Sequence, residues 1–338
     1  MDVASFCRLL PKAELHAHLS GSVSVASLQR HCGADAVWDF QRGDRSLEEV
    51  FKIFGLVQRA TNDPQVLQQI TEEVVLEFAE DGVRWLELRT TPRACADTGM
   101  TKCMYLERVL QGISDAQRHS SIQVGVLVSV DRSKSLEEAR ENLTLAKEYF
   151  GRGVVGVELS GNPEKGDIPA LLQLLRELGR DQGMPVSLHF AEIQDDIEGR
   201  QMLDFCPQRL GHAVCMSSTI HQLLVQSSIP VEICLTSNVK TLSVSSVENH
   251  VLSDLMAAGH PCALCTDDKG VFETSVSEEY CRAAKELGLT RKQLVSLAED
   301  SFKCAFMPEE VRDGMLKELR EFAEKCLDSS DTATAEEA

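Results

Sequence analysis

Positive charge and long apolar runs are what this sequence lacks. Its 338 residues contain 34 Lys and Arg against 53 Asp and Glu, which gives a net charge of −19. Such an excess of negative charge argues against non-specific binding to nucleic acid or to an anionic membrane surface. No segment approaches the roughly 20 apolar residues of a membrane-spanning helix. Any anionic ligand must therefore meet a local basic pocket.

Features of secreted proteins are also missing. The first residues, MDVASFCRLLPKAE, lack the basic flank and the apolar core of a signal peptide. The twelve cysteines are scattered singly and lack the dense, regular spacing of a disulfide framework. We therefore expect a cytoplasmic protein in which most cysteines are reduced and buried.

Short β-rich apolar runs alternate with segments of helical period along most of the chain. Eight runs are predicted as strands, at residues 13–19, 83–92, 122–131, 154–162, 185–192, 209–214, 229–238 and 261–268. Eight strand–helix units predict a parallel sheet closed into a (β/α)8 TIM barrel, with an open doubly wound sheet as the competing arrangement. The connection at residues 20–80 is too long for one helix, so we expect extra helices there over the barrel mouth.

We expect residues 1–327 to form this single barrel domain. Within it, the helical pattern of residues 167–183 should stop at Gly183, since glycine commonly ends helices. Residues 328–338 are polar and acidic and carry no large apolar side chain, which predicts a disordered tail.

Polar residues stand where the predicted strands end. In a barrel these carboxyl ends share one rim, where the active sites of this fold lie. His16 and His18 are one residue apart in an extended run, so both side chains point to the same face, about 7 Å apart. Such a pair alone is more often structural, but His189 and Asp267 stand at the ends of two further strands. Three imidazoles and a carboxylate suit zinc with one position open for water, which favours hydrolysis.

Three further residues of this rim are candidate catalytic groups. After a turn of the backbone, Glu192 could donate or accept a proton beside the metal. His212 follows Gly211, which permits a close backbone approach, and it could orient or deprotonate the attacking water. Asp268 lies where the chain bends away from Asp267, so its carboxylate could face the substrate. Without the other histidines, His212 would be interpreted as a core residue and Asp268 as part of a turn.

Five motifs follow one another along the chain: ELHAHLSGS, SLHFAE, LGHA, LTSNVK and CTDDKGVF. In this order, and over residues 10–310, they resemble the adenosine/AMP deaminase family of zinc hydrolases. Within the family, LELRTTPR, TSNVK and TDDKGVF are most similar to the adenosine deaminase-like branch, the N6-methyl-AMP deaminases. Adenosine deaminases proper usually have Pro at the position of Lys269. The resemblance implies hydrolysis of N6-methyl-AMP to IMP and methylamine.

The resemblance also implies roles for single residues. Glu192 would protonate purine N1 while hydroxide attacks C6, and His212 would assist the water. Asp268 would contact the attacking water or purine N7, and the backbone at Gly161 would meet the purine edge. One zinc ion per chain would be held by His16, His18, His189 and Asp267.

The implied substrate contacts extend from the metal to a 5′-phosphate. An aspartate common in adenosine deaminases at the position of Ser20 would repel a phosphate, whereas Ser20 can donate a hydrogen bond to it, and Arg93 offers positive charge nearby. Ser20 and Gln58 replace Asn and His that are common in the methyl-AMP branch, and Ala213 replaces a usual Gly. The expected substrate-binding residues are His18, Ser20, Gln58, Thr90, Thr91, Pro92, Arg93, Asp131, Gly161 and Asp268.

Several alternatives remain open at this point. The same ligands would serve a zinc hydrolase acting on another C–N bond, a deaminase of free adenosine, or a non-catalytic nucleotide-binding protein. PCALC, at residues 261–265, matches half of the cytidine-deaminase zinc signature, but the required upstream H-x-E is missing. We expect a monomer whose partner is a small purine nucleotide. Four basic residues could line the phosphate site or form structural ion pairs: Arg89, Arg132, Lys240 and Lys269.

Overall fold

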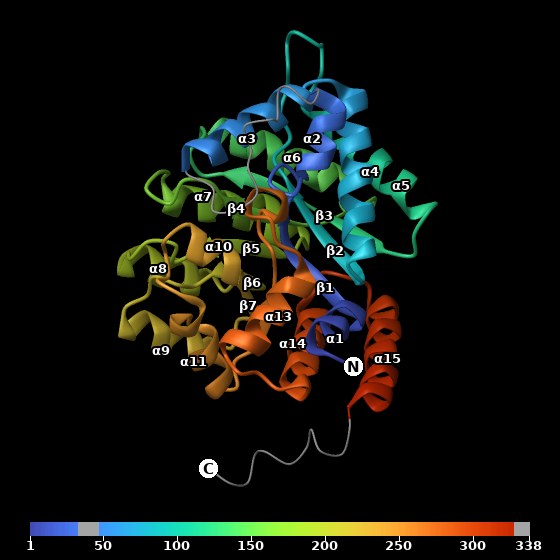
Figure 1. The fold of residues 1–338 in the computed structure, drawn as a ribbon. Coiled ribbons are helices and arrows are strands. Elements are labelled where there is room, and N and C mark those ends of the chain that lie inside the picture. Colours follow the sequence, from blue (N-terminus) through green and yellow to red (C-terminus); the bar gives the residue numbers. More distant parts are fainter. Residues whose placement is uncertain (33–46, 328–338) are drawn as a thin grey trace.

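The computed structural model describes residues 1–32 and 47–327. Eight parallel strands form one sheet in the order of the sequence, β1 to β8 (Figure 1). Their bounds are β1 Lys12–His18, β2 Val83–Thr90, β3 Gln123–Asp131, β4 Val154–Ser160, β5 Val186–Phe190, β6 Arg209–His212, β7 Val231–Ile233 and β8 Cys262–Leu264.

The sheet closes between β1 and the residues that follow β8. Ala17 pairs with Asp267 in a parallel bridge. On either side of it, His18 N–H donates to the Asp267 carbonyl at 3.0 Å, and Asp267 N–H donates to the His16 carbonyl at 2.8 Å. These bonds confirm the predicted (β/α)8 barrel and exclude the open doubly wound sheet.

Helices surround the barrel and connect its strands. Within the described residues, no helix is long and apolar enough to cross a bilayer. The α-helices are α1 Val3–Leu9, α2 Val25–Cys32, α3 Leu47–Ala60, α4 Pro64–Glu80, α5 Lys102–Gln117, α6 Leu136–Tyr149, α7 Ile168–Leu174, α8 Asp196–Phe205, α9 Ser218–Ser227, α10 Leu235–Lys240, α11 Leu252–Ala257, α12 Lys269–Phe272, α13 Val276–Glu286, α14 Arg291–Cys304 and α15 Glu309–Cys326.

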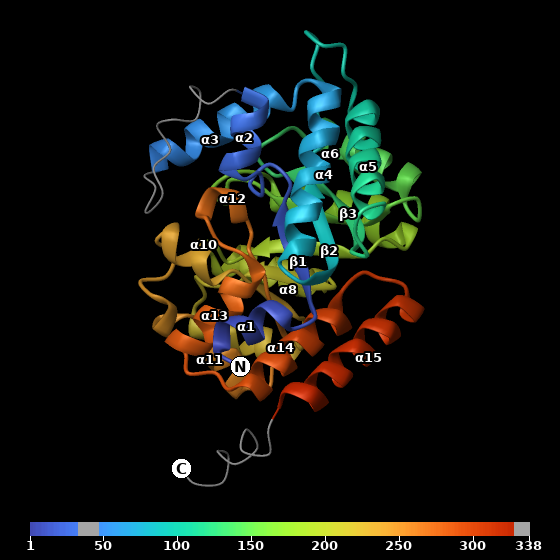
Figure 2. The ribbon, with the colours of Figure 1, turned by 45° about the vertical axis from the view of Figure 1, so that its right-hand side comes forward.

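The long first connection contains α2, α3 and α4, which confirms the expected extra helices. Asp63 caps α4 by accepting from the N–H groups of Gln65 and Val66, and Pro64 occupies the first turn, where no donor is needed. Figures 1 and 2 show α2 and α3 at one end of the molecule and α1, α14 and α15 at the other. The extra helices therefore cover the end of the barrel that β1 runs toward.

The seventh predicted strand is too long. The observed strand, β7, ends at Ile233, and α10 begins at Leu235. The prediction is too long because a short mixed run does not distinguish a strand from a buried helical turn. The expected stop at Gly183 is confirmed by its left-handed φ of 81°. The predicted tail, residues 328–338, lies outside the described residues.

All twelve cysteines are free thiols, but the expectation that most are buried is wrong. Several lie on the outer faces of helices, as Cys103 does on α5, and so keep some exposure. The four that are buried are Cys7, Cys234, Cys262 and Cys265.

Candidate metal centre and active site

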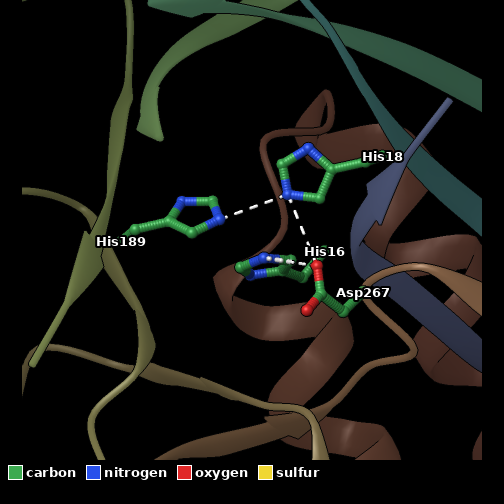
Figure 3. A group of neighbouring side chains, drawn as sticks. All are labelled: His16, His18, His189 and Asp267. Atoms are coloured by element: carbon green, nitrogen blue, oxygen red, sulfur yellow. Dashed lines mark hydrogen bonds and ion pairs between the residues drawn. The ribbon is translucent and has the colours of Figure 1, made fainter. Parts of the chain in front are cut away.

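Three imidazoles and one carboxylate converge at the carboxyl ends of the strands (Figure 3). His16 and His18 come from β1, His189 comes from β5, and Asp267 follows β8. His18 Nε2 lies 3.2 Å from His189 Nε2 and 3.5 Å from Asp267 Oδ1. His16 Nε2 lies 3.6 Å from the same carboxylate oxygen. One donor atom of each residue falls within 4.8 Å of the others, a spacing that one metal ion can bridge.

The hydrogen bonds around the histidines fit a bound cation. His16 Nδ1 lies 2.7 Å from Glu232 Oε2, and His189 Nδ1 lies 3.0 Å from the Leu159 carbonyl. With their protons held at Nδ1, both rings direct an Nε2 lone pair toward the position that one metal ion could occupy. His16 Nε2 is buried and has no hydrogen-bond partner among the described residues. Burial also lowers the pKa of His16, which keeps the ring neutral and able to ligate.

A second possible group shares Asp267 and adds His212 and Cys234. Metals bind the thiolate form of cysteine, but burial raises the pKa of the Cys234 thiol well above its usual value. The set with three histidines is therefore the better candidate.

Buried charged residues inside the barrel hold the histidines that are candidate metal ligands. The Arg89 guanidinium donates to both Glu158 and Glu232, and Glu158 Oε2 lies 3.3 Å from His189 Nδ1. Arg209 donates to Glu232 at 2.6 Å and also pairs with Glu87. All of these charged side chains are fully buried, so each needs its partner to offset lost hydration.

Left-handed backbone conformations gather where the strands end. Ala191, His212, Ala213 and Asp267 have φ values of 50°, 68°, 56° and 61°. Non-glycine residues rarely adopt this region, and strain of this kind clusters at functional sites. At Ala191 it provides the turn expected between His189 and Glu192. At Ala213 the backbone has the conformation that glycine adopts most readily.

His212 lies beside the convergent histidines. Its ring centroid is 4.7 Å from that of His16 and 5.0 Å from that of His189. Its Nε2 lies 3.9 Å from Glu192 Oε1, and the Glu192 side chain is 26% exposed. At Gly211, a Cβ atom would lie 2.7 Å from His16 Cε1, so the expected close backbone approach is present. His212 and Glu192 thus reach the open side of the site together.

The two neighbouring aspartates have different surroundings. Asp267 Oδ2 accepts from the Ser237 hydroxyl at 2.6 Å, which leaves Oδ1 toward the histidines. Asp268 Oδ1 is buried without a hydrogen-bond partner among the described residues. Burial and the charge of Asp267 raise the pKa of Asp268. A Cβ atom on Gly21 would lie 1.6 Å from Asp268 Oδ1, so glycine is required there.

The residues expected to bind the nucleotide lie in three places: around Arg93, at the ends of β3 and β4, and in the turn after β1. Arg93 Nη2 donates to the Gln58 carbonyl at 3.2 Å, and its guanidinium lies 5.0 Å from the centre of the Tyr105 ring. The Thr90 hydroxyl lies 2.8 Å from that of Tyr105, and Thr91 and Pro92 follow it.

The second group joins the ends of β3 and β4, where a Cβ on Gly161 would lie 2.2 Å from Asp131 Oδ1. Ser20 is exposed in the turn after β1. None of the hydrogen bonds of Arg93 goes to Ser20.

The four other basic candidates have structural partners. Arg89 is buried in the ion-pair network below the histidines. Arg132 pairs with Glu198 at 2.6 Å, and Lys240 Nζ donates to the Phe272 carbonyl at 2.8 Å. Lys269 pairs with Glu77. Arg89, Arg132 and Lys269 thus form the structural ion pairs that the sequence left open as an alternative, whereas Lys240 donates to a backbone carbonyl instead.

Sequence reasoning assigned no role to several residues that hold the site. Glu158 and Glu232 support the histidines, Ser237 holds Asp267, and Asn238 contacts His212 at 3.1 Å. A usable signal existed, because Glu158 and Glu232 are lone carboxylates inside otherwise apolar strands. Buried carboxylates need partners, so their presence predicts a charged network inside the barrel.

The family model for adenosine deaminase matches residues 11–322 of the chain. This chain belongs to the adenosine deaminase family. The match spans all eight strands and the four convergent ligand candidates.

Relatives within the family are similar over most of their length. The N6-mAMP deaminase of Arabidopsis thaliana is 41% identical over 335 residues, covering 90% of this chain and 94% of that protein. The N6-methyl-AMP deaminase of Homo sapiens is 36% identical, covering 94% and 95%. The apo structure of the Arabidopsis thaliana N6-methyl-AMP deaminase aligns with a TM-score of 0.89 and 38% identity, covering 95% and 99%. A structure of arabidopsis ADAL complexed with IMP gives the same TM-score and identity, covering 96% and 100%.

Proposed function

We propose that the protein hydrolyses N6-methyl-AMP to IMP and methylamine. The convergence of His16, His18, His189 and Asp267 carries the proposal, because this donor set suits a hydrolytic metal centre. Extensive similarity to N6-methyl-AMP deaminases supports the choice of substrate. The reaction adds water at purine C6 and releases the N6 substituent as an amine.

We propose zinc as the metal, one ion per chain. Three imidazoles and a carboxylate fit its borderline-soft character, and zinc can expand from four to five ligands to admit a water molecule. When bound, zinc lowers the pKa of water to about 7 and so makes hydroxide available at neutral pH.

The protein groups handle the protons and hold the purine. Glu192 holds the proton that is delivered to purine N1, which draws electrons from C6 and favours attack there. His212 lies 3.9 Å from Glu192 and orients the attacking water. Asp268, in its partly exposed position at the rim, contacts that water or purine N7. The backbone at Gly161 meets the purine edge.

The 5′-phosphate is assigned to the rim between the turn after β1 and the end of β2. Ser20 is exposed there and carries no charge that would repel a phosphate. Arg93 brings a guanidinium, but its hydrogen bonds to Gln58 and Thr61 reduce its freedom to reach a ligand. That restraint favours a second candidate function, the deamination of free nucleosides. His18, Thr90, Thr91, Pro92 and Asp131 complete the proposed substrate contacts.

A substrate panel distinguishes these functions. The zinc-loaded protein is incubated with AMP, N6-methyl-AMP, adenosine and N6-methyladenosine, and the release of ammonia or methylamine is measured. We expect the highest kcat/KM for N6-methyl-AMP. Faster turnover of adenosine than of either monophosphate would replace the nucleotide assignment with nucleoside deamination, and no turnover would support a binding protein. The monomeric state and the cytoplasmic location stay predictions.

A further inference from the structure

We propose that Asn238 and His250 are positioning residues that hold the His212 imidazole with its Nε2–H directed into the active site. Neither residue belongs to the metal or substrate groups described above. The kinetic consequence rests on the proposed function, whereas the direction of the hydrogen bonds follows from geometry alone.

Three hydrogen bonds connect a helix N-terminus to the active site. The Leu252 N–H donates to His250 Nδ1 at 3.2 Å. His250 Nε2 lies 3.1 Å from Asn238 Oδ1. Asn238 Nδ2 lies 3.1 Å from His212 Nδ1. This series of hydrogen bonds therefore runs from α11, through Asn238 on α10, to the end of β6.

The backbone N–H of Leu252 fixes the direction of all three bonds, because a backbone N–H can only donate. His250 Nδ1 must accept, so the proton of the neutral ring lies on Nε2 and is donated to Asn238 Oδ1. The Asn238 amide then presents its NH₂ group to His212 Nδ1, which must also accept. A neutral His212 consequently carries its proton on Nε2.

Burial prevents water from replacing these bonds. His250, Asn238 and His212 are 2%, 3% and 3% exposed. Turning the Asn238 amide around would place its NH₂ group against the His250 N–H, so that two donors would face each other. Leaving buried polar groups unpaired in this way costs about 1–3 kcal/mol for each group. Burial also lowers the pKa of His250 to about 4, so its ring is neutral at neutral pH.

The start of α11 and the whole of α10 make the arrangement rigid. Leu252 is the first residue of α11, where a backbone N–H has no partner within the helix and is free to bind His250. On α10, Ser237 precedes Asn238 and holds Asp267 at 2.6 Å. One short helix therefore orients both a metal-binding carboxylate and the His212 ring.

The sequence left two roles open for His212, to orient the attacking water or to deprotonate it, and this arrangement decides between them. Its only lone pair is engaged by Asn238, so its Nε2–H acts as a donor toward the oxygen of the attacking water. The proton lost by that water must go to a carboxylate, either Asp268 or Glu192 once Glu192 has delivered its own proton to purine N1. As the C6–N bond breaks, the carboxylate returns that proton to the leaving amine, and the proton left on the C6 hydroxyl restores the Glu192 acid as the C6 carbonyl forms.

Nitrogen NMR of the zinc-loaded full chain tests the proposal directly. Histidine is labelled with ¹⁵N, and the His212 signals are assigned with a His212→Gln variant. We expect a protonated Nε2 and an unprotonated Nδ1 in the wild-type protein. In Asn238→Asp the carboxylate can only accept, so we expect a proton on His212 Nδ1. In that variant kcat should fall by about 10- to 100-fold with KM unchanged, as is typical when a supporting partner is lost.

Substitutions at His250 separate positioning from packing. His250→Gln keeps an N–H donor for Asn238 and should retain the wild-type protonation of His212 and most of kcat. His250→Leu removes the donor and should lose both. His260→Gln is a matched control, because His260 is also buried but its Nε2–H donates to the Ile229 carbonyl, 2.8 Å away, and it is not bonded to His250, Asn238 or His212.

Wild-type His212 with its proton on Nδ1 would overturn the proposal, as would an Asn238→Asp variant with unchanged spectrum and kcat. If Asn238→Asp does not fold, the wild-type spectrum and the two His250 variants still decide the question. If no purine is turned over, the proposed function fails, while the ¹⁵N result still shows which nitrogen of His212 carries the proton.

Discussion

Arg89 and Glu158 form a hydrogen-bonded ion pair of 2.8 Å in which neither side chain has any exposed surface. The same guanidinium donates to Glu232, and the two carboxylates contact His189 and His16. One arginine thus balances the carboxylates behind two of the expected metal ligands.

Replacing Arg89 by Met should weaken both the fold and the metal site. Breaking a buried ion pair on one side costs about 3–5 kcal/mol, because the remaining charge stays buried without a partner. Metal affinity should also fall by about 10- to 100-fold through the misplaced histidines. Urea unfolding and zinc titration measure the two effects.

Arg132→Met is the matched control for this prediction. Arg132 also forms a largely buried pair, with Glu198, but neither residue contacts the histidines. We expect it to reduce stability while zinc affinity stays at the wild-type value. Equal losses of zinc affinity in both variants would mean that Arg89 acts only through general stability.

Replacing His189 by Ala should remove metal and activity together. The ring supplies Nε2 to the cluster, 3.2 Å from His18 Nε2. Elemental analysis of the purified variant should find far less than one zinc per chain, whereas His260→Ala should keep the metal. Full zinc content in His189→Ala would remove His189 from the ligand set.

Replacing Glu192 by Gln should keep the metal but slow turnover. A positioned acid or base typically contributes about 10²- to 10⁴-fold to the rate, and the amide cannot transfer a proton in the same way. Zinc content and the circular dichroism spectrum should match the wild type. Near-normal kcat in a fully metallated variant would mean that another group protonates purine N1.

Replacing Ser20 by Asp should harm nucleotide substrates far more than nucleosides. A carboxylate beside a phosphate adds repulsion of about 1–3 kcal/mol, equivalent to several-fold to a hundredfold in kcat/KM. The measurement compares N6-methyl-AMP with N6-methyladenosine in both proteins, and Ser20→Asn is the neutral control. Equal losses for both substrates would place the phosphate away from Ser20.

Stability should rise at alkaline pH through Lys12. Burial lowers the pKa of its ammonium group from 10.5 to about 8, although Nζ donates to the carbonyls of Asp81, Cys7 and Leu10. Between these two pKa values the unfolded chain binds the extra proton, so the free energy of unfolding increases with pH. The gain should be about 3 kcal/mol relative to Lys12→Met, which lacks the titrating group. If the free energy of unfolding, measured with urea, changed with pH equally in the wild type and in Lys12→Met from pH 8 to 10.5, this prediction would be contradicted.

The strands and the polar residues at their ends could be predicted because both leave local patterns. An apolar run that ends in His16 and His18 shows a buried strand with a functional rim, and barrel geometry then brings Asp267 beside them. The α10 boundary could not be found in the same way. Ser237 and Asn238 turn inward on a helix to reach Asp267 and His212, a tertiary requirement that short apolar runs do not reveal.

The interior charges were harder to predict, since their meaning lies in pairing across the barrel. Arg89 seemed a candidate for phosphate when considered alone, yet it contacts Glu158 and Glu232 on strands far away in the sequence. A single buried charge in a strand predicts that a partner exists. Which partner it meets depends on the register between strands, and this register is known only from the closed barrel.

Three of the four candidate metal ligands also make the hydrogen bonds of the seam that closes the barrel between β1 and the residues after β8. His18 N–H bonds to the Asp267 carbonyl and Asp267 N–H bonds to the His16 carbonyl, while the side chains of all three converge. A cation bound there would act as a cross-link between the first and last strands, closing a loop of nearly the whole chain and lowering the entropy of states in which the seam is open. Hydrogen exchange at the amides of His18 and Asp267 should therefore slow upon zinc binding, more than at amides between β3 and β4. Binding of the metal would thus complete the active site and stabilise the closed barrel at the same time.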